Sequence, residues 1–180
     1  MKNNYTQYRI NIVMRAKTPS ESAIETYQIM MPSHSNPSWK DGKVELGTVN
    51  GGAILNLIDN VAGIVALRHC RTRVVTASID SMSFLSPVHV GELLILKASV
   101  NYVGKTSLEV GVRVETENLR TGERRKTGTA YLTFVAISET GKPIPVPPLK
   151  PKTEEEKRRW EEAKRRREER LKTIKKQKKE

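Results

Sequence analysis

Cysteine is nearly absent from this chain of 180 residues, since Cys70 is the only one. A single cysteine excludes an internal disulfide and is typical of proteins that fold in a reducing compartment. Long apolar runs are missing too. Nowhere do about 18 apolar residues follow one another, and the first 17 residues contain no apolar stretch long enough for a signal peptide. The sequence therefore predicts a soluble cytoplasmic protein with no membrane partner.

Aromatic residues are also scarce, at 5% of the chain, while charged residues make up 29%. The mean hydropathy of −0.54 is low for a globular protein and indicates that a charged segment dilutes an ordinary core. That segment is the C-terminus, where residues 150–180 hold 15 Lys and Arg against 8 Glu, more than half of the formal net charge of +12. We expect one domain, residues 1–150, followed by a charged tail, residues 151–180.

The sequence of the tail predicts a helix that is mostly surrounded by solvent. Thr153 followed by Glu156 forms a capping box, and the order of acidic then basic residues suits the helix dipole. Its apolar residues are too sparse for a coiled-coil seam, so we expect docking through Trp160 at most. Because Glu is mixed with the cations and only one aromatic residue lies among them, a nucleic-acid partner is not expected.

The rest of the chain follows a simple order of strand, long helix and antiparallel strands. Alternation is clearest in SLEVGVRVETE, whose leucine and valines share one face. One sheet can bury an apolar helix only by curling around it, which predicts an α+β fold. We expect a strand at residues 24–31, a loop at 32–43, the helix from 51 to about 69, and strands at residues 73–84, 93–102, 107–117 and 126–138.

The helical segment NGGAILNLIDNVAG, residues 50–63, contains one residue that packing does not explain. Ile54, Ile58 and Val61 recur at helical spacing, and small residues fill most other positions, so the helix is apolar nearly all round and we expect it to be buried. Asp59 lies in its middle. An unpaired carboxylate out of water costs several kcal/mol. Asp59 is therefore either kept for reactivity or tied to a nearby Ser, Thr or backbone group.

Three blocks of sequence carry a family resemblance: NGGAILNLIDNVAGIVALRHC, then TRVVTASIDSMSFLSPVHVGE, then VGKTSLEV. They match in order and spacing, and the chain from about residue 24 to 149 resembles the hotdog-fold acyl-CoA thioesterases, in particular the cytosolic acyl-CoA hydrolases. The resemblance implies a long central helix wrapped by a curved antiparallel sheet. It also implies a homo-oligomer built from dimers, as tetramer or hexamer, with the thioester at the dimer interface.

The implied activity is hydrolysis of fatty acyl-CoA to a free fatty acid and coenzyme A. By resemblance, Asp59 is the general base or nucleophile, and the backbone amides of Gly51 and Gly52 polarise the thioester carbonyl. The chemistry suits these residues, because the first amides of a helix lack internal partners and lie at the positive end of its dipole. No cofactor is implied, since coenzyme A is part of the substrate and product.

The segment before the helix departs from the family pattern. Asn50 lies where the family usually has a histidine or an aromatic residue, and Thr48 lies where it has an asparagine. Asn50 is a candidate catalytic residue, yet asparagine before Gly-Gly is also an ordinary cap or turn residue. The group that orients the water or the carbonyl is therefore left open.

Further candidates concern substrate binding. Ser78 matches a position near the reacting centre of relatives, although a strand serine also serves structure. Coenzyme A carries phosphates, so cations at the end of the helix and in the GKTS turn are candidate partners. His69 and Cys70 have no partners at metal spacing, so no metal site is expected. The four cations are Arg68, Arg71, Arg73 and Lys105.

Two rival functions remain at this point. A hotdog-fold acyl-CoA hydratase is expected to place an Asp and a His close together, and His34, His69 and His89 all lie outside residues 51–59. A non-catalytic acyl-CoA-binding regulator would share the fold without the reaction. Measured turnover would separate the regulator from an enzyme.

Overall fold

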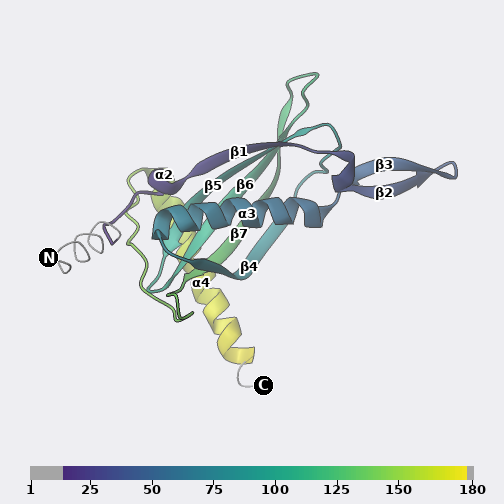
Figure 1. The fold of residues 1–180 in the computed structure, drawn as a ribbon. Helices are drawn as coiled ribbons and strands as arrows, with labels where there is room; N and C mark the ends of the chain where they lie inside the picture. Colours follow the sequence, from purple (N-terminus) through teal and green to yellow (C-terminus); the bar gives the residue numbers. More distant parts are fainter. Residues whose placement is uncertain (1–13, 178–180) are drawn as a thin grey trace.

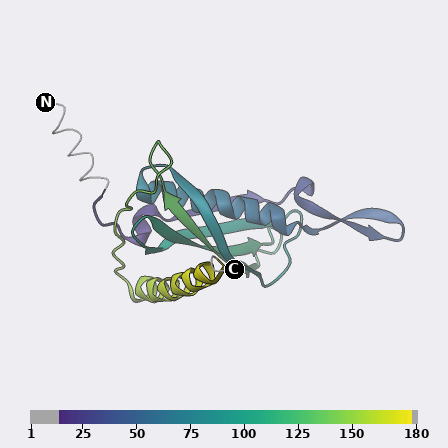
Figure 2. The ribbon, with the colours of Figure 1, turned by 90° about the horizontal axis from the view of Figure 1, so that it is seen from below.

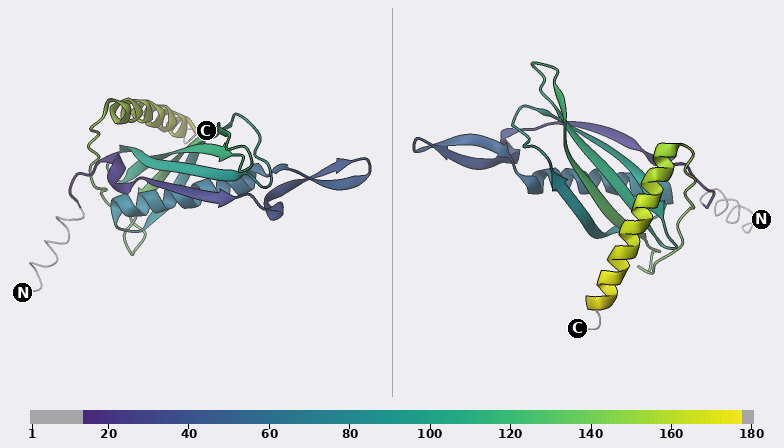
Figure 3. Two further views of the ribbon diagram at one scale, coloured as in Figure 1. Left: turned by 90° about the horizontal axis from the view of Figure 1, so that it is seen from above. Right: turned by 180° about the vertical axis from the view of Figure 1, so that it is seen from behind.

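An antiparallel sheet of five strands and one long helix make up the body of the protein, described here by a computed structural model over residues 14–177 (Figure 1). The helix α3 lies against one face of the sheet, and the C-terminal helix α4 crosses the opposite face (Figure 3). This confirms the α+β prediction. The first residues, expected to carry no signal peptide, extend outside the described range. In spatial order the strands are β1 (Ile24–Ile29), β5 (Leu93–Val103), β6 (Ser107–Glu117), β7 (Arg124–Ala136) and β4 (Val74–Phe84).

The core forms between α3 (Gly51–Cys70) and the sheet. Apolar residues at helical spacing on one side of α3 meet the inward residues of the central strands, among them Leu132 and Phe134 of β7. Inward and outward side chains alternate along β6, which is why the period-two pattern of residues 107–117 located this strand at its observed bounds. The buried residues of α3 are Ile54, Ile58, Val61, Ala62, Val65, Ala66, His69 and Cys70.

The other side of α3 is not covered within one chain. Ile64 is 46% exposed and Leu67 is 47% exposed. The prediction of a buried helix therefore holds for one face only, because a single sheet cannot wrap the whole circumference of a helix. By length and composition α3 could also cross a membrane, but its buried face packs on the sheet as a core helix does.

Residues predicted as a loop form a separate two-stranded hairpin instead, β2 (Ser35–Lys40) and β3 (Lys43–Val49). The hairpin projects from the body beyond the start of α3 (Figure 2). Asp41 and Gly42 form its turn, both with positive φ, at 51° and 76°. An Asp-Gly pair supplies this two-residue turn at low cost, so the hairpin signal was present in the sequence. Trp39, near the tip, is 72% exposed.

Two short helices complete the N-terminal part, α2 (Pro19–Ser22) and the 3-10 helix η1 (Pro32–His34). Before α2, the Nζ of Lys17 donates to the backbone carbonyl of His69. Its positive charge thus lies at the negative end of the α3 dipole. His69 is fully buried, and its Nε2 lies 2.9 Å from the carbonyl of Pro147. These contacts join the end of α3 to the segment before α2 and to the proline-rich segment before α4.

The C-terminal helix α4 (Glu154–Gln177) corrects the expectation of a solvated helix. Its capping box is confirmed, since Glu156 N–H donates to the Thr153 hydroxyl at 3.2 Å and Thr153 N–H to the Glu156 carboxylate at 3.1 Å. Trp160 does dock, with its ring centroid 5.3 Å from that of Tyr102. However, Ala163 is fully buried, and further along two arginines of α4 form ion pairs with the sheet. The tail thus packs along a stripe and not at one point.

Cys70 gives a simple test of this packing at the end of α3. Burial raises the pKa of the Cys70 thiol to about 12, so almost no reactive thiolate exists near neutral pH. We expect the native protein to resist alkylation by iodoacetamide at pH 7.5 and the urea-unfolded protein to react at the rate of a free thiol. Mass spectrometry of both samples measures this. Rapid labelling of the folded protein would contradict the packing described for Cys70.

Candidate active site

Asp59 lies on the side of α3 that faces the edge strand β4. The hydroxyl of Thr76 donates to Oδ1 of Asp59 at 2.9 Å. Asp59 is only partly buried in the single chain, because β4 pairs on one side only, with β7. The helix and the strand run antiparallel, so the start of α3 meets the end of β4, where a Cβ at Gly51 would lie 3.3 Å from the Phe84 ring. Contacts between α3 and β4 therefore run from Asp59 to the N-terminus of α3.

Asn50 caps that N-terminus. Its Oδ1 accepts from the N–H of Gly52 at 2.7 Å and from the N–H of Ala53 at 3.3 Å. A Cβ at residue 52 would lie 2.9 Å from the same oxygen, so glycine makes room for the cap. Since the amide of Gly52 is occupied, it is not the free donor that the sequence predicted. The N–H of Gly51 has no acceptor among the described residues and stays available.

A second asparagine at this end was missed by sequence analysis. The Nδ2 of Asn50 donates to Oδ1 of Asn36 at 2.7 Å. This contact fixes the orientation of both amides, because Oδ1 of Asn50 is already used as an acceptor by the helix. The Nδ2 of Asn36 therefore points away from Asn50, with no partner among the described residues. Asn36 lies at the base of the hairpin, 14 positions before Asn50, so no local pattern marked it.

A mainly apolar cavity of about 420 Å³ opens beside the first turn of α3. Val49, Ile54, Phe84 and Val88 line it together with Gly51. A hydroxyl also borders it, since Ser86 lies in the lining and its Oγ is buried without a partner in the described part of the chain. An apolar cavity with a few polar groups at one end is typical of a site for a small molecule with an apolar tail.

Ser78, predicted to lie near the reacting centre, does not join the group around Asp59. Its hydroxyl donates to Oδ1 of Asp80 at 2.6 Å. Asp80 in turn contacts Arg170 of α4, on the opposite face of the sheet. Thr76, two positions earlier, is the residue of VVTASID whose hydroxyl contacts Asp59. A role of Ser78 in binding substrate stays a prediction.

The predicted cations gather at the far end of the sheet from the cavity. Arg68 and Arg71 lie at the end of α3, and backbone bonds join Arg73 and the β5–β6 turn, which holds Lys105, to the end of β7. All four side chains are exposed. The single chain places none of them beside Asp59, so their role in binding phosphates stays a prediction. Over residues 14–177 no group of three or more His, Cys, Asp or Glu is placed to hold a metal ion.

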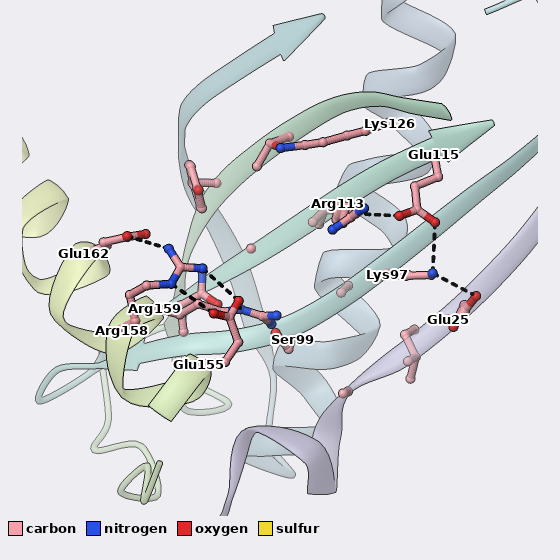
Figure 4. Close-up of a pocket in the computed structure, with 18 residues that line it drawn as sticks. Glu25, Lys97, Ser99, Arg113, Glu115, Lys126, Glu155, Arg158, Arg159 and Glu162 are labelled. Atoms are coloured by element: carbon pink, nitrogen blue, oxygen red, sulfur yellow. Dashed lines mark hydrogen bonds and ion pairs between the residues drawn. The ribbon is translucent and has the colours of Figure 1, made fainter. Parts of the chain in front are cut away.

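A larger cavity, of about 740 Å³, lies on the opposite face between the sheet and the first turns of α4 (Figure 4). Its carboxylates are already paired: Glu115 bonds Lys97 and Arg113, while Glu155 bonds Arg158 and Arg159. The paired charges largely neutralise one another. Because the sheet separates this cavity from Asp59, we do not assign it to the candidate active site.

Residues 46–123, which include Asp59 and the N-terminus of α3, match the Thioesterase superfamily. A crystal structure of an apo-hexameric acyl-CoA thioesterase is similar, with a TM-score of 0.81 and 42% identity over 89% of this chain and 97% of that one. The chain belongs to the Thioesterase superfamily, and the predicted hotdog fold is confirmed.

Other relatives agree. The acyl-CoA thioester hydrolase YkhA of Bacillus subtilis is 49% identical over 109 residues, 61% of this chain and 63% of that protein. The cytosolic acyl coenzyme A thioester hydrolase of Rattus norvegicus is 39% identical over 63% of this chain and 30% of its own length. The chain thus spans less than two thirds of these curated relatives.

A Staphylococcus aureus acyl-CoA hydrolase in complex with butyryl coenzyme A and coenzyme A is similar in structure as well. Its TM-score is 0.81, with 33% identity over 91% of this chain and 95% of that one. Two alanine variants of the same hydrolase, one at an aspartate and one at a threonine, have TM-scores of 0.81 and 0.79.

The cap can be tested through stability. Asn50→Ala removes the acceptor for two helix amides and should lower the free energy of unfolding by about 1 kcal/mol. Asn50→Asp keeps the acceptor and adds a negative charge at the positive end of the helix, so it should stay close to the wild type. Urea denaturation of the three proteins measures the difference. Equal losses in both variants would show that the Asn36 contact, and not the cap, is what Asn50 contributes.

Proposed function

We propose that this chain hydrolyses fatty acyl-CoA thioesters to a free fatty acid and coenzyme A. The observation that carries the proposal is the Asp59 carboxylate, which accepts a hydrogen bond from Thr76 on the side of α3 that faces β4. Asp59 and Thr76 are 17 positions apart. The aspartate and the threonine replaced in the two Staphylococcus aureus variants have the same separation, which supports a shared role for the pair.

In the proposed reaction, water adds to the thioester carbonyl and the coenzyme A thiol leaves. Asp59 accepts a proton from the water, or attacks the carbonyl itself, and the hydrogen bond from Thr76 holds its carboxylate in one orientation. The free N–H of Gly51 donates to the carbonyl oxygen as it becomes negative. The reaction consumes only water, so we propose that no cofactor is required.

Asn36 is proposed as the group that orients the water or the carbonyl, a role the sequence left open. Its Nδ2 is directed away from Asn50 and is free to donate to an oxygen bound near the start of α3. Asn50 then acts on the reaction only by holding Asn36 and by capping α3. The apolar cavity beside Gly51 is proposed to receive the acyl chain, and the exposed cations Arg68, Arg71, Arg73 and Lys105 to meet the phosphates of coenzyme A.

The cellular location of the reaction is proposed from the names of the relatives. The rat relative is named as cytosolic, and a cytoplasmic location agrees with the single reduced cysteine. Nucleic acid and membrane are not proposed as partners. If the wild type bound acyl-CoA without turnover, the protein would be an acyl-CoA-binding regulator.

Asp59→Asn tests the proposal directly. It keeps the shape of the side chain and an oxygen that can accept from Thr76, so stability should hold. It removes the base, and kcat on acyl-CoA thioesters should fall at least about a hundredfold with binding retained. A spectrophotometric panel from acetyl-CoA to palmitoyl-CoA measures this, and Asp41→Asn at the hairpin tip is the control. Full activity in the Asp59 variant, or no turnover of any thioester by the wild type, would refute the proposal.

The protein is expected to be a homo-oligomer built from dimers. Ile64, Leu67 and Ile79 leave apolar surface open on α3 and on the edge strand β4, and an unpaired edge invites pairing across a two-fold axis. The similar acyl-CoA thioesterase is hexameric. Sedimentation at micromolar concentration should show a dimer, tetramer or hexamer, and Ile79→Glu should dissociate it. A clean wild-type monomer would exclude a site shared between chains.

A further inference from the structure

Strand β4 presents side chains to both faces of the sheet in an irregular order. In a regular strand the even-numbered residues 74 to 84 would share one face. Four of these residues do face α3. Val74 and Met82 pack against the core, Thr76 bonds Asp59, and Phe84 lies beside Gly51. Ser78 and Asp80 face α4 instead. The pairing with β7 shifts register twice, between Thr76 and Ser78 and again between Ile79 and Ser81, so two bulges invert the strand and then restore it.

Asp80 accepts the hydrogen bonds that hold the inverted segment of β4, residues 78–80. Its Oδ1 accepts from the Ser78 hydroxyl at 2.6 Å, and its Oδ2 accepts from the Thr133 hydroxyl of β7 at 2.7 Å. The side chain is only 9% exposed. Two hydroxyls alone leave a nearly buried negative charge without a counter-charge, which is unfavourable.

Arg170 of α4 supplies that charge. Its Nη1 donates to Oδ2 of Asp80 and to the hydroxyl of Thr133. One turn earlier, Arg166 makes a bidentate pair with Glu109 of β6 and lies 3.6 Å from the Tyr131 ring centroid. Both arginines are similarly covered, with side chains 19% and 22% exposed. Arg170 forms its ion pair with β4 and Arg166 forms its ion pair with β6, so the two residues are a matched pair that differs in the strand bound.

We propose that Arg170 is a positioning residue for the active site: by binding Asp80 it holds the double bulge of β4, and so keeps Thr76 aimed at Asp59. This rests on the proposed thioesterase function. A shift of one residue in strand register moves every side chain to the other face. Without Arg170, the segment around Asp80 can relax toward solvent, and the first bulge lies directly beside Thr76. The tail then contributes to hydrolysis although it carries no reacting group.

Kinetics of Arg170→Met, which keeps the apolar stem but removes the charge, test the proposal against the control Arg166→Met. We expect kcat on acyl-CoA to fall about tenfold or more in the Arg170 variant, since small misplacements of reacting groups have effects of this size, while KM stays within about twofold. Arg166→Met should keep the wild-type kcat. Arg170→Lys should recover part of the rate, and adding Asp80→Asn to Arg170→Met should cause little further loss, because both changes break one contact.

A second readout does not depend on activity. The methyl NMR signal of Thr76 should shift in Arg170→Met and stay in place in Arg166→Met, with thermal denaturation confirming that both variants are folded. Equal kcat in the two variants, or an unmoved Thr76 signal in Arg170→Met, would overturn the positioning role. A wild type that hydrolyses no acyl-CoA thioester refutes the proposed function instead, and the Thr76 signal then still decides whether Arg170 holds the bulge.

Discussion

The packing of one face of α3 against the sheet is the interaction on which the rest of the structure depends. Six apolar side chains of α3, from Ile54 to Ala66, are buried against the inward residues of the strands. A single sheet of five strands covers only part of a helix, so the other face stays open beside the edge strand. Asp59 lies at that boundary, where a carboxylate can keep contact with water and with a bound molecule. The fold thus leaves the Asp59 carboxylate partly exposed in the single chain.

The N-terminus of α3 is the second consequence of this packing. The helix points its positive end at an apolar cavity, and the Asn50 cap decides which amides are free. Capping occupies Gly52 and leaves Gly51 available. The same cap reaches Asn36, so the hairpin, which projects away from the body, has its base at the site. Stability of the helix and geometry of the site therefore rest on the same side chain.

Strand β4 connects the two faces of the sheet. Its inward residues contact α3, and its bulged middle contacts α4, so this one strand touches both Asp59 and the charged tail. The stripe of α4 that docks consists of Trp160, Ala163, Arg166 and Arg170, which recur at helical spacing. Two of these four are cations whose apolar stems pack while their charges pair with carboxylates of the sheet. A highly charged helix with few apolar residues can therefore still dock on a polar face.

The sequence by itself determined the elements that depend on local periodicity: the apolar helix, the four strands after it and the capping box at Thr153. It also marked Asp59, because a carboxylate inside an apolar helical pattern conflicts with simple packing. The Asp-Gly turn of the hairpin was equally readable and was overlooked among the surrounding loop-forming residues. What only the tertiary structure decided was which polar groups meet. Thr76 and not Ser78 faces Asp59, because bulges invert β4, and Asn36 reaches Asn50 across a hairpin. Arg170 binds Asp80, which lies 90 positions earlier in the chain. Contacts between residues far apart in the chain depend on register and on which face a strand presents, and no local pattern of residues specifies either.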